Sequence, residues 1–248
     1  MIKDFEYILK KFISEKYLLK KRLTRAIKKN YEKELEFIEK FSDKSKDALD
    51  IGVYRGVYSF QLAKYFNFVH SFEPNPLLFP YLNKNLKKIL KNIQLYNYAL
   101  SDSNGDTKLK LPIRTESIFK NNIEELYQLG AASIHSKNKF TNFKEVIVKK
   151  KKLDDFKIIN KIGFIKIDVE GHEFSVLKGS KKILKKYKPV LLIEIDKQHS
   201  SKVKETFNYL KELRYESFYF DGIDLIKILS YEENIRKDFK NFIFKYKE

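Results

Sequence analysis

The strongest constraint on the fold of this chain is an alternation of short apolar segments with amphipathic segments, which begins at Asp47. Five apolar segments have the length of buried strands, namely DALDIG, FVHSFE, IQLYNYAL, GFIKID and PVLLIEID. Four other segments carry apolar residues at helical spacing, namely residues 58–66, 77–90, 173–186 and 203–213. Strands that alternate with helices pair in parallel through right-handed crossovers. The pattern predicts an α/β fold with a doubly wound, mostly parallel sheet.

Other regions flank or interrupt this alternation. Residues 1–45 have apolar side chains at helical spacing and neither glycine nor proline, which predicts an N-terminal helical extension. Residues 101–160 are less regular, with a turn signal at Asn104-Gly105 and the strand candidates TKLKL and EVIVKK, so we expect a substrate-specific insertion there. The segments YESFYF and DLIKIL should pair antiparallel at the end of the sheet. Residues 46–248 then form one main domain.

The composition excludes several classes of protein. With no cysteine, the chain has no disulfide, no thiolate metal site and no cysteine nucleophile. No stretch approaches the roughly 20 apolar residues of a membrane-spanning helix, and the opening MIKDFEYILKKF lacks the apolar block of a signal peptide. We therefore expect a cytoplasmic protein without a transmembrane segment.

The formal net charge of +18 raises the question of a nucleic-acid partner. Only six of the 51 basic residues are arginine, and the lysines are spread from Lys3 to Lys247. Because proteins that read base sequence favour the bidentate fork of arginine, a nucleic-acid partner is the less favoured interpretation. We expect a small substrate that carries phosphate or another anion, while contact with anionic lipid head groups is a weaker alternative. A basic stripe leading into the functional cleft would favour RNA, whereas a pocket with two or three cations would favour a small anion.

The segment DIGVYRGVYS, which runs from Asp50 to Ser59, lies where the first strand gives way to a helix. Gly52 and Gly56 allow a sharp bend and the close approach of a ligand. Tyr54 takes the place of the second glycine in the G-x-G-x-x-G motif, which argues against NAD or FAD and suits a ligand without phosphates. Asp50 is placed to pair with a cationic amino group of that ligand. The alternative is a structural turn in which Asp50 only caps the helix.

An acidic residue also follows the second strand. Glu73 lies 21 residues after Gly52, at a strand end where a carboxylate can accept both hydroxyl protons of a ribose. Pro74 fixes the direction of the chain, and Asn75 begins the connection to the next helix. The alternative is a solvated glutamate at the end of a strand.

The third predicted strand ends at Ala99 and Leu100, followed by Ser101 and Asp102. The carboxyl ends of parallel strands line one crevice, so these two polar residues are expected near an adenine edge. Ser-Asp-x-Asn-Gly is equally an ordinary turn sequence, and that interpretation stays open.

Charged residues also end the later strands. Lys166 and Asp168 point to the same face of their strand, and charge inside a strand that is covered on both sides is costly unless it is paired or functional. Glu194, in the next strand, should approach the same edge. Asp168 or Glu194 could act as a general base or orient an acceptor hydroxyl or amine. A purely structural ion pair between Lys166 and Glu194 is the alternative.

The ordered set of D-x-G-x-x-x-G-x-x-S, F-E-P-N, A-L-S-D-x-x-G and I-K-I-D-V-E-G-H-E resembles FkbM-type methyltransferases, which depend on S-adenosylmethionine (SAM), over residues 47–196. The resemblance implies a Rossmann-like class I methyltransferase fold with seven strands and an antiparallel terminal strand. It assigns two sets of residues: Asp50, Gly52, Gly56, Ser59, Glu73 and Asp102 to SAM binding, and Lys166, Asp168, Glu170, Gly171 and Glu173 to the reaction cleft. Val53-Tyr54-Arg55 departs from the family, where small residues and Asn are more frequent.

The resemblance also implies a reaction. SAM would be the cofactor, S-adenosylhomocysteine (SAH) the product, and a sugar hydroxyl of a surface glycan or capsule precursor the leading acceptor. N-methylation of a phosphorylated small amine and, in another class, an RNA-binding protein or RNA methyltransferase are the alternatives. The candidates to take the acceptor proton are Asp168, Glu194, His172 and His135. We predict no metal, because Asp168 and Glu194 lack a clear third oxygen ligand. The N-terminal helices are candidates for homodimer contacts or for a lid.

Overall fold

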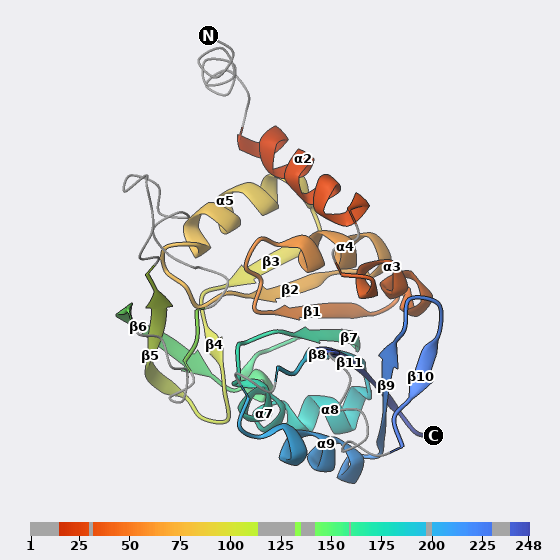
Figure 1. Ribbon diagram of the computed structural model, residues 1–248. Helices are drawn as coiled ribbons and strands as arrows, with labels where there is room; N and C mark the ends of the chain where they lie inside the picture. Colours follow the sequence, from red (N-terminus) through yellow and green to blue (C-terminus); the bar gives the residue numbers. More distant parts are fainter. Residues whose placement is uncertain are drawn as a thin grey trace.

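The computed structural model describes residues 15–29, 32–113, 132–134, 142–158, 160–196, 200–229 and 239–248. Its main sheet has eight strands within this part of the chain (Figure 1): β1 (Asp47–Ile51), β2 (Val69–Phe72), β3 (Ile93–Tyr96), β7 (Ile162–Ile167), β8 (Val190–Glu194), β9 (Tyr215–Phe220), β10 (Leu225–Lys227) and β11 (Asn241–Tyr246). Their order is β10-β9-β11-β8-β7-β1-β2-β3. The five strands from β8 to β3 are parallel, which confirms the predicted α/β class.

Helices cover both faces of the parallel strands (Figure 1). One face carries α4 (Val57–Tyr65) and α5 (Phe79–Ile89), and the other carries α7 (Glu173–Lys178), α8 (Lys181–Tyr187) and α9 (Val203–Glu212). Because successive side chains of a strand point to opposite faces, Ala48 packs in one core and Leu49 in the other. Burial on both faces explains why these strands read as unbroken apolar runs.

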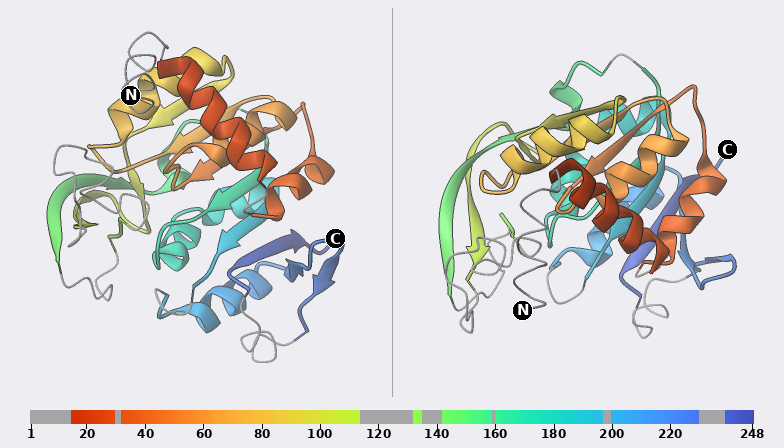
Figure 2. Two further views of the ribbon diagram at one scale, coloured as in Figure 1. Left: turned by 45° about the horizontal axis from the view of Figure 1, so that its top comes forward. Right: turned by 90° about the horizontal axis from the view of Figure 1, so that it is seen from above.

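The expected N-terminal helical extension contains α2 (Glu15–Lys28), α3 (Glu34–Phe37) and the 3-10 turn η1 (Ile38–Phe41). Figure 2 shows α2 lying beside α5 and α4, where Leu19 and Leu23 are buried. None of the helices in the described ranges is long and apolar enough to cross a membrane.

A second, smaller sheet flanks the carboxyl ends of the parallel strands. It has the order β4-β6-β5 and consists of β4 (Ala99–Leu100), β5 (Gly105–Pro112) and β6 (Phe143–Lys151). The predicted strands TKLKL and EVIVKK pair antiparallel within it. The predicted third strand, residues 93–100, is divided, because β3 belongs to the main sheet and β4 pairs with β6.

The far end of the main sheet corrects the prediction in two respects. The predicted pair of β9 and β10 is antiparallel as expected, but the sheet has eight strands in the described residues and not seven. The strand that periodicity does not predict is β11, which has the sequence NFIFKY. It lies between β8 and β9, antiparallel to both, and buries Phe242, Ile243 and Phe244. The antiparallel strand is therefore inside the sheet, with β9 and β10 beyond it.

The predicted helix over residues 173–186 is two helices, α7 and α8. They are separated by Gly179 and Ser180. A Cβ atom at Gly179 would lie 1.9 Å from the Ser101 carbonyl oxygen, so the backbone at this break packs directly against residue 101.

Candidate active site

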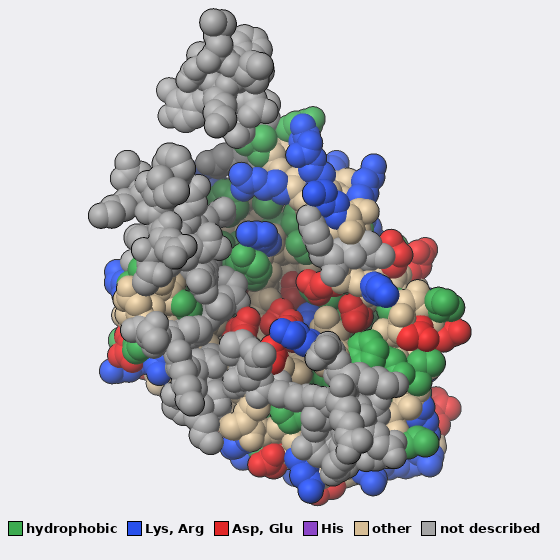
Figure 3. Space-filling view, in the orientation of Figure 1, with side chains coloured by type: hydrophobic (Ala, Val, Ile, Leu, Met, Phe, Trp, Pro, Cys, Tyr) green, Lys and Arg blue, Asp and Glu red, His purple; other side chains and the backbone are tan. Residues whose placement is uncertain are grey.

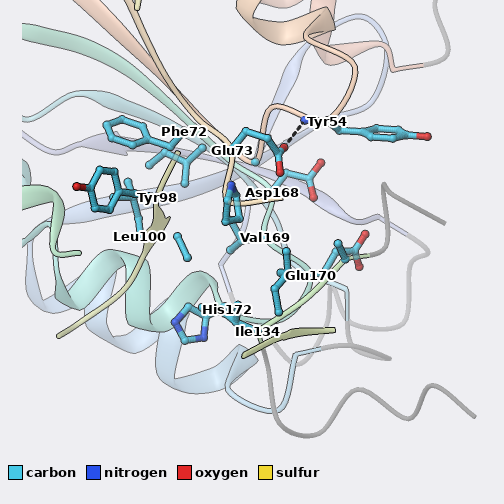
Figure 4. Close-up of a pocket in the computed structure, with 16 residues that line it drawn as sticks. Tyr54, Phe72, Glu73, Tyr98, Leu100, Ile134, Asp168, Val169, Glu170 and His172 are labelled. Carbon is cyan, nitrogen blue, oxygen red and sulfur yellow. Dashed lines mark hydrogen bonds between the residues drawn. The ribbon is translucent and has the colours of Figure 1, made fainter. Parts of the chain in front are cut away.

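A pocket of about 640 Å³, partly open to solvent, lies at the carboxyl ends of β1, β2 and β7. Figure 4 shows Phe72, Tyr98 and Leu100 at one end, Glu73 in the middle, and Asp168 beyond it. The residues that line it are Ile51, Gly52, Tyr54, Phe72, Glu73, Pro74, Tyr98, Ala99, Leu100, Leu109, Ala132, Ile134, Asp168, Val169, Glu170 and His172. This is the edge at which doubly wound sheets bind ligands.

The loop after β1 is shaped by residues with positive φ. Gly52 has φ 90°, Tyr54 φ 46° and Gly56 φ 77°. A Cβ atom at Gly52 would lie only 1.7 Å from the carbonyl oxygen of Asp168, so a side chain at this position cannot be accommodated. The loop after β1 and the end of β7 are thus in direct backbone contact at the pocket.

Asp50 lies beneath this loop and is not among the residues that line the pocket. Its side chain is 1% exposed and accepts a hydrogen bond from Ser59 Oγ, which in turn lies 2.8 Å from Ser71 Oγ. Burial raises the pKa of Asp50 to about 7, against the lowering effect of the Ser59 hydrogen bond. In this geometry Asp50 and Ser59 fix the first turn of α4 under the pocket.

Glu73 lines the pocket at the end of β2, and both of its carboxylate oxygens are held by backbone donors. Oε2 accepts from the Tyr54 amide at 2.9 Å (Figure 4). Oε1 accepts from the Asn75 amide, also at 2.9 Å. Burial raises the pKa of Glu73 to about 7. Pro74 lines the pocket beside it, whereas Asn75 is fully buried behind it.

The segment after β4 supports the pocket from behind. Ala99 lines the pocket, while Ser101 is 2% exposed and its Oγ lies 3.0 Å from Nε2 of His172. Asp102 lies 3.7 Å from Nζ of Lys178 on α7. His172 itself lines the pocket, so Ser101 orients a lining residue and does not reach the pocket directly.

Lys166 is fully buried below Asp168 at the end of β7. Its Nζ lies 4.0 Å from Asp168 Oδ2, donates to Asn241 Oδ1 at 3.3 Å, and lies 4.9 Å from the centre of the Tyr58 ring. Within the described part of the chain, its direct charged partner is Asp168 and not Glu194. A buried cation needs such partners, and these contacts tie the ends of β7 and β11 together.

Further carboxyl groups gather at the acidic end of the pocket. Burial, followed by the charge of Asp168, raises the pKa of Glu170 to about 8 and that of Glu194 to about 7. Burial also raises the pKa of Glu173 to about 7, and one of its oxygens accepts from the Gly171 amide at 2.7 Å. Glu170 lines the pocket, whereas Glu194 and Glu173 lie outside its lining. Figure 3 shows this concentration of acidic atoms near the centre of the face.

The sequence did not point to the apolar wall of the pocket, which includes Phe72, Tyr98, Leu109 and Ile134. Apolar residues at strand ends carry no signal that distinguishes them from core residues. No group of three or more His, Asp or Glu in the described residues could hold a metal ion. His135 lies outside the described residues.

Comparisons with known proteins point to one family. The sequence matches the methyltransferase FkbM domain over residues 50–217, and no curated protein matches it. The methyltransferase FkbM from Methylobacillus flagellatus KT has a TM-score of 0.52 and 17% identity, over 82% of this chain and 44% of that protein. An rRNA methylase from Streptococcus thermophilus has a TM-score of 0.49 and 12% identity, over 86% and 94%. A putative methyltransferase from Streptococcus mutans, in complex with SAH, has a TM-score of 0.47 and 14% identity, over 85% and 94%.

This chain spans less than half of the Methylobacillus protein, and at 17% identity the likeness concerns the fold. The FkbM domain, by contrast, covers more than half of the 248 residues, from the end of β1 into β9. It includes Gly52, Glu73 and Asp168, which meet at the pocket. The chain therefore belongs to the FkbM methyltransferase domain family.

Proposed function

We propose that this protein is a SAM-dependent methyltransferase whose acceptor is a small polar molecule, with a sugar hydroxyl of a bacterial surface glycan or capsule precursor as the leading candidate. The observation that carries the proposal is the order of side chains along the pocket. Phe72 and Tyr98 form an apolar end, Glu73 lies in the middle, and Asp168 and Glu170 form an acidic end (Figure 4).

The pocket fits SAM better than a dinucleotide. The apolar end suits a flat adenine ring, and Glu73 offers a carboxylate to the ribose hydroxyls. Among the described residues, the acidic side chains that line the pocket are Glu73, Asp168 and Glu170, and none of the lining residues is Lys or Arg. These charges attract the cationic sulfonium and amino group of SAM and repel a pyrophosphate. Gly52 leaves room for close backbone approach.

When bound, SAM supplies a methyl group on a positively charged sulfur. Glu73 anchors the ribose, and its two backbone hydrogen bonds hold it in place. Asp168 takes the proton of the acceptor hydroxyl as the oxygen attacks, and Lys166, 4.0 Å away, orients its carboxylate. Holding the acceptor and the cofactor in the right orientation supplies much of the remaining reduction of the activation barrier.

A phosphorylated small amine is the second candidate acceptor. The carboxyl groups of Asp168, Glu170 and Glu194 influence one another electrostatically. Such a cluster favours an acceptor that arrives as a cation, as a protonated amine does. An amine needs only its neutral form to attack, so a base of moderate strength is sufficient.

Calorimetric titration with SAH tests the cofactor assignment. Glu73→Gln should weaken SAH binding by about tenfold to a hundredfold, because it removes a charge-assisted hydrogen bond to the ribose. Glu205→Gln removes the same charge from the exposed surface of α9 and should leave the SAH affinity unchanged. Equal affinity of wild type and Glu73→Gln, in protein that melts normally, contradicts the ribose role of Glu73.

A mass-spectrometric screen tests the reaction itself. Wild-type protein and SAM are incubated with sugar phosphates, nucleotide sugars and phosphorylated amines, and each mixture is examined for the addition of one methyl group. The proposed function predicts a product with one of these classes. Failure of the wild-type protein to bind SAH would refute the proposal before any acceptor is considered.

A further inference from the structure

A second hollow, of about 1020 Å³, lies between α2 and the helices α4 and α5. Its floor is apolar and includes Leu19, Leu23 and Leu82, which are buried. Tyr54 lines both this hollow and the pocket described above, so the two are neighbours across one residue. The residues that line it are Leu19, Arg22, Leu23, Arg25, Ala26, Lys29, Tyr54, Arg55, Val57, Leu78, Tyr81 and Leu82.

The charged residues that line this hollow in the described part of the chain are cations, namely Arg22, Arg25, Lys29 and Arg55. Figure 3 shows Lys and Arg side chains over α2 and around the hollow beneath it. The neighbouring pocket has the opposite charge, because its charged residues in the described ranges are the carboxylates Glu73, Asp168 and Glu170. One molecule that extends across Tyr54 would therefore meet positive charge at one end and negative charge at the other.

Arginine is enriched in this hollow, although most basic residues of the chain are lysine. The sequence has 51 basic residues, of which six are arginine, and three of those six line this hollow. In the described residues, no carboxylate lies within ion-pair distance of these three side chains. The Arg55 guanidinium lies 4.9 Å from the centre of the Tyr54 ring, which holds it at the boundary between the two cavities.

We propose that this hollow binds the phosphate of the methyl acceptor, while the reactive end of the acceptor reaches past Tyr54 toward Asp168. The planar fork of arginine matches phosphate oxygens in a bidentate manner. SAM carries no phosphate, so the cationic hollow serves the acceptor and not the cofactor. The inference rests on the proposed methyl transfer and adds to it a binding site formed by Arg22, Arg25 and Arg55.

The shape of the site favours a small phosphate ester over a flat anionic surface. Its cations surround a concave, apolar floor, which suits a phosphate attached to a compact organic group. Sugar phosphates and nucleoside-diphosphate sugars share this chemistry, and the experiment separates them.

Calorimetry with inorganic pyrophosphate on the SAH-loaded protein tests the site. The variant Arg22→Gln/Arg25→Gln/Arg55→Gln should bind pyrophosphate at least about tenfold more weakly than wild type, since each arginine contributes a charge-assisted hydrogen bond. The control Lys20→Gln/Lys21→Gln/Lys28→Gln removes the same charge from exposed positions of α2 that do not line the hollow, and should change the affinity by less than about threefold.

Glucose 6-phosphate and uridine-diphosphate glucose are titrated in parallel, with inorganic phosphate as the reference. Tighter binding of either than of inorganic phosphate, lost in the arginine variant, supports the site and identifies the source of the phosphate. No binding of pyrophosphate to wild type, or equal losses in the two triple variants, overturns it. Binding of phosphatidylglycerol vesicles without binding of any soluble phosphate also overturns it, in favour of a membrane surface.

Titration of SAH into the same variants separates this inference from the proposed function. The arginine variant should keep the wild-type SAH affinity, which also shows that it is folded. Loss of pyrophosphate binding with normal SAH binding supports the phosphate site, whereas absence of SAH binding in wild type removes the methyltransferase proposal itself.

Discussion

At the scale of single residues, Asp168 is the side chain on which the proposed chemistry depends. It is one-third exposed, lines the pocket, and lies 4.0 Å from a fully buried lysine. Asp168→Asn keeps the shape of the side chain and removes its capacity to take a proton. We expect it to lower kcat by about 10² to 10⁴-fold, which is the usual contribution of a general base, and to leave SAH affinity nearly unchanged.

Initial rates with the acceptor identified by the screen measure this effect, and SAH calorimetry on the same protein is the control. Turnover at the wild-type rate in Asp168→Asn removes this residue from the mechanism. Loss of SAH binding together with turnover would instead give Asp168 a role in holding the cofactor.

The residues of the pocket were predicted in part. Spacing along the chain identified Gly52, Glu73 and Asp168, because each follows a strand at the edge where parallel strands end. It could not show that Asp50 lies below the loop, since the depth of a side chain depends on how the backbone after it bends. The contact of Ser101 with His172 joins residues far apart in the sequence, and nothing local indicates it.

At the scale of secondary-structure elements, the contact between the loop after β1 and the end of β7 leaves no room for a side chain at Gly52. Gly52→Ala should reduce the free energy of unfolding by more than about 3 kcal/mol, because positive φ and a steric clash with the Asp168 carbonyl add together. Gly105→Ala is the matched control: Gly105 has φ 131°, but an added Cβ would meet nothing within 4 Å.

Urea denaturation of both variants measures the difference. The Gly105→Ala loss reports the cost of the backbone conformation, and the excess loss in Gly52→Ala reports the clash. Equal losses would mean that the two backbone segments separate without cost, and the close contact would then have no role in shaping the pocket.

The elements that periodicity predicted well are those buried on both faces or amphipathic over several turns, such as β1, β7 and α5. The elements that it missed depend on distant contacts. Residues 93–100 look like one strand, and only the pairing of β4 with β6 divides them. The helix over residues 173–186 is interrupted because Gly179 packs against Ser101. The segment of β11 is short and lysine-flanked, and its apolar residues become a strand only between two neighbours.

At the scale of the whole molecule, a chain of net charge +18 gathers buried carboxyl groups around one pocket. Burial raises the pKa of five of them, to about 8 for Glu170 and to about 7 for Asp50, Glu73, Glu173 and Glu194. A carboxyl group whose pKa is higher in the folded state stabilises the fold fully below its unfolded pKa, near 4. That contribution is lost as the pH rises through the folded value.

Thermal unfolding of the ligand-free protein should therefore give a Tm that falls between pH 5 and pH 8. Each such group contributes up to about 1.4 kcal/mol per pH unit between its two pKa values. Glu170→Gln should flatten the upper part of this fall, and Glu205→Gln should not. A Tm that is constant or rises over this range would show that burial does not raise the pKa values of these carboxyl groups.

The position of β11 has a consequence for how the chain assembles during synthesis. Residues 215–227 leave the ribosome before residues 241–246, yet in the described part of the chain β9 and β10 are joined to the rest of the sheet by β11. Until that segment emerges, β8 has an open edge and the hairpin of β9 and β10 has no partner strand. A nascent chain at this stage holds unpaired sheet edges on β8 and β9, so ribosome-bound chaperones have most to protect in the interval between these two segments.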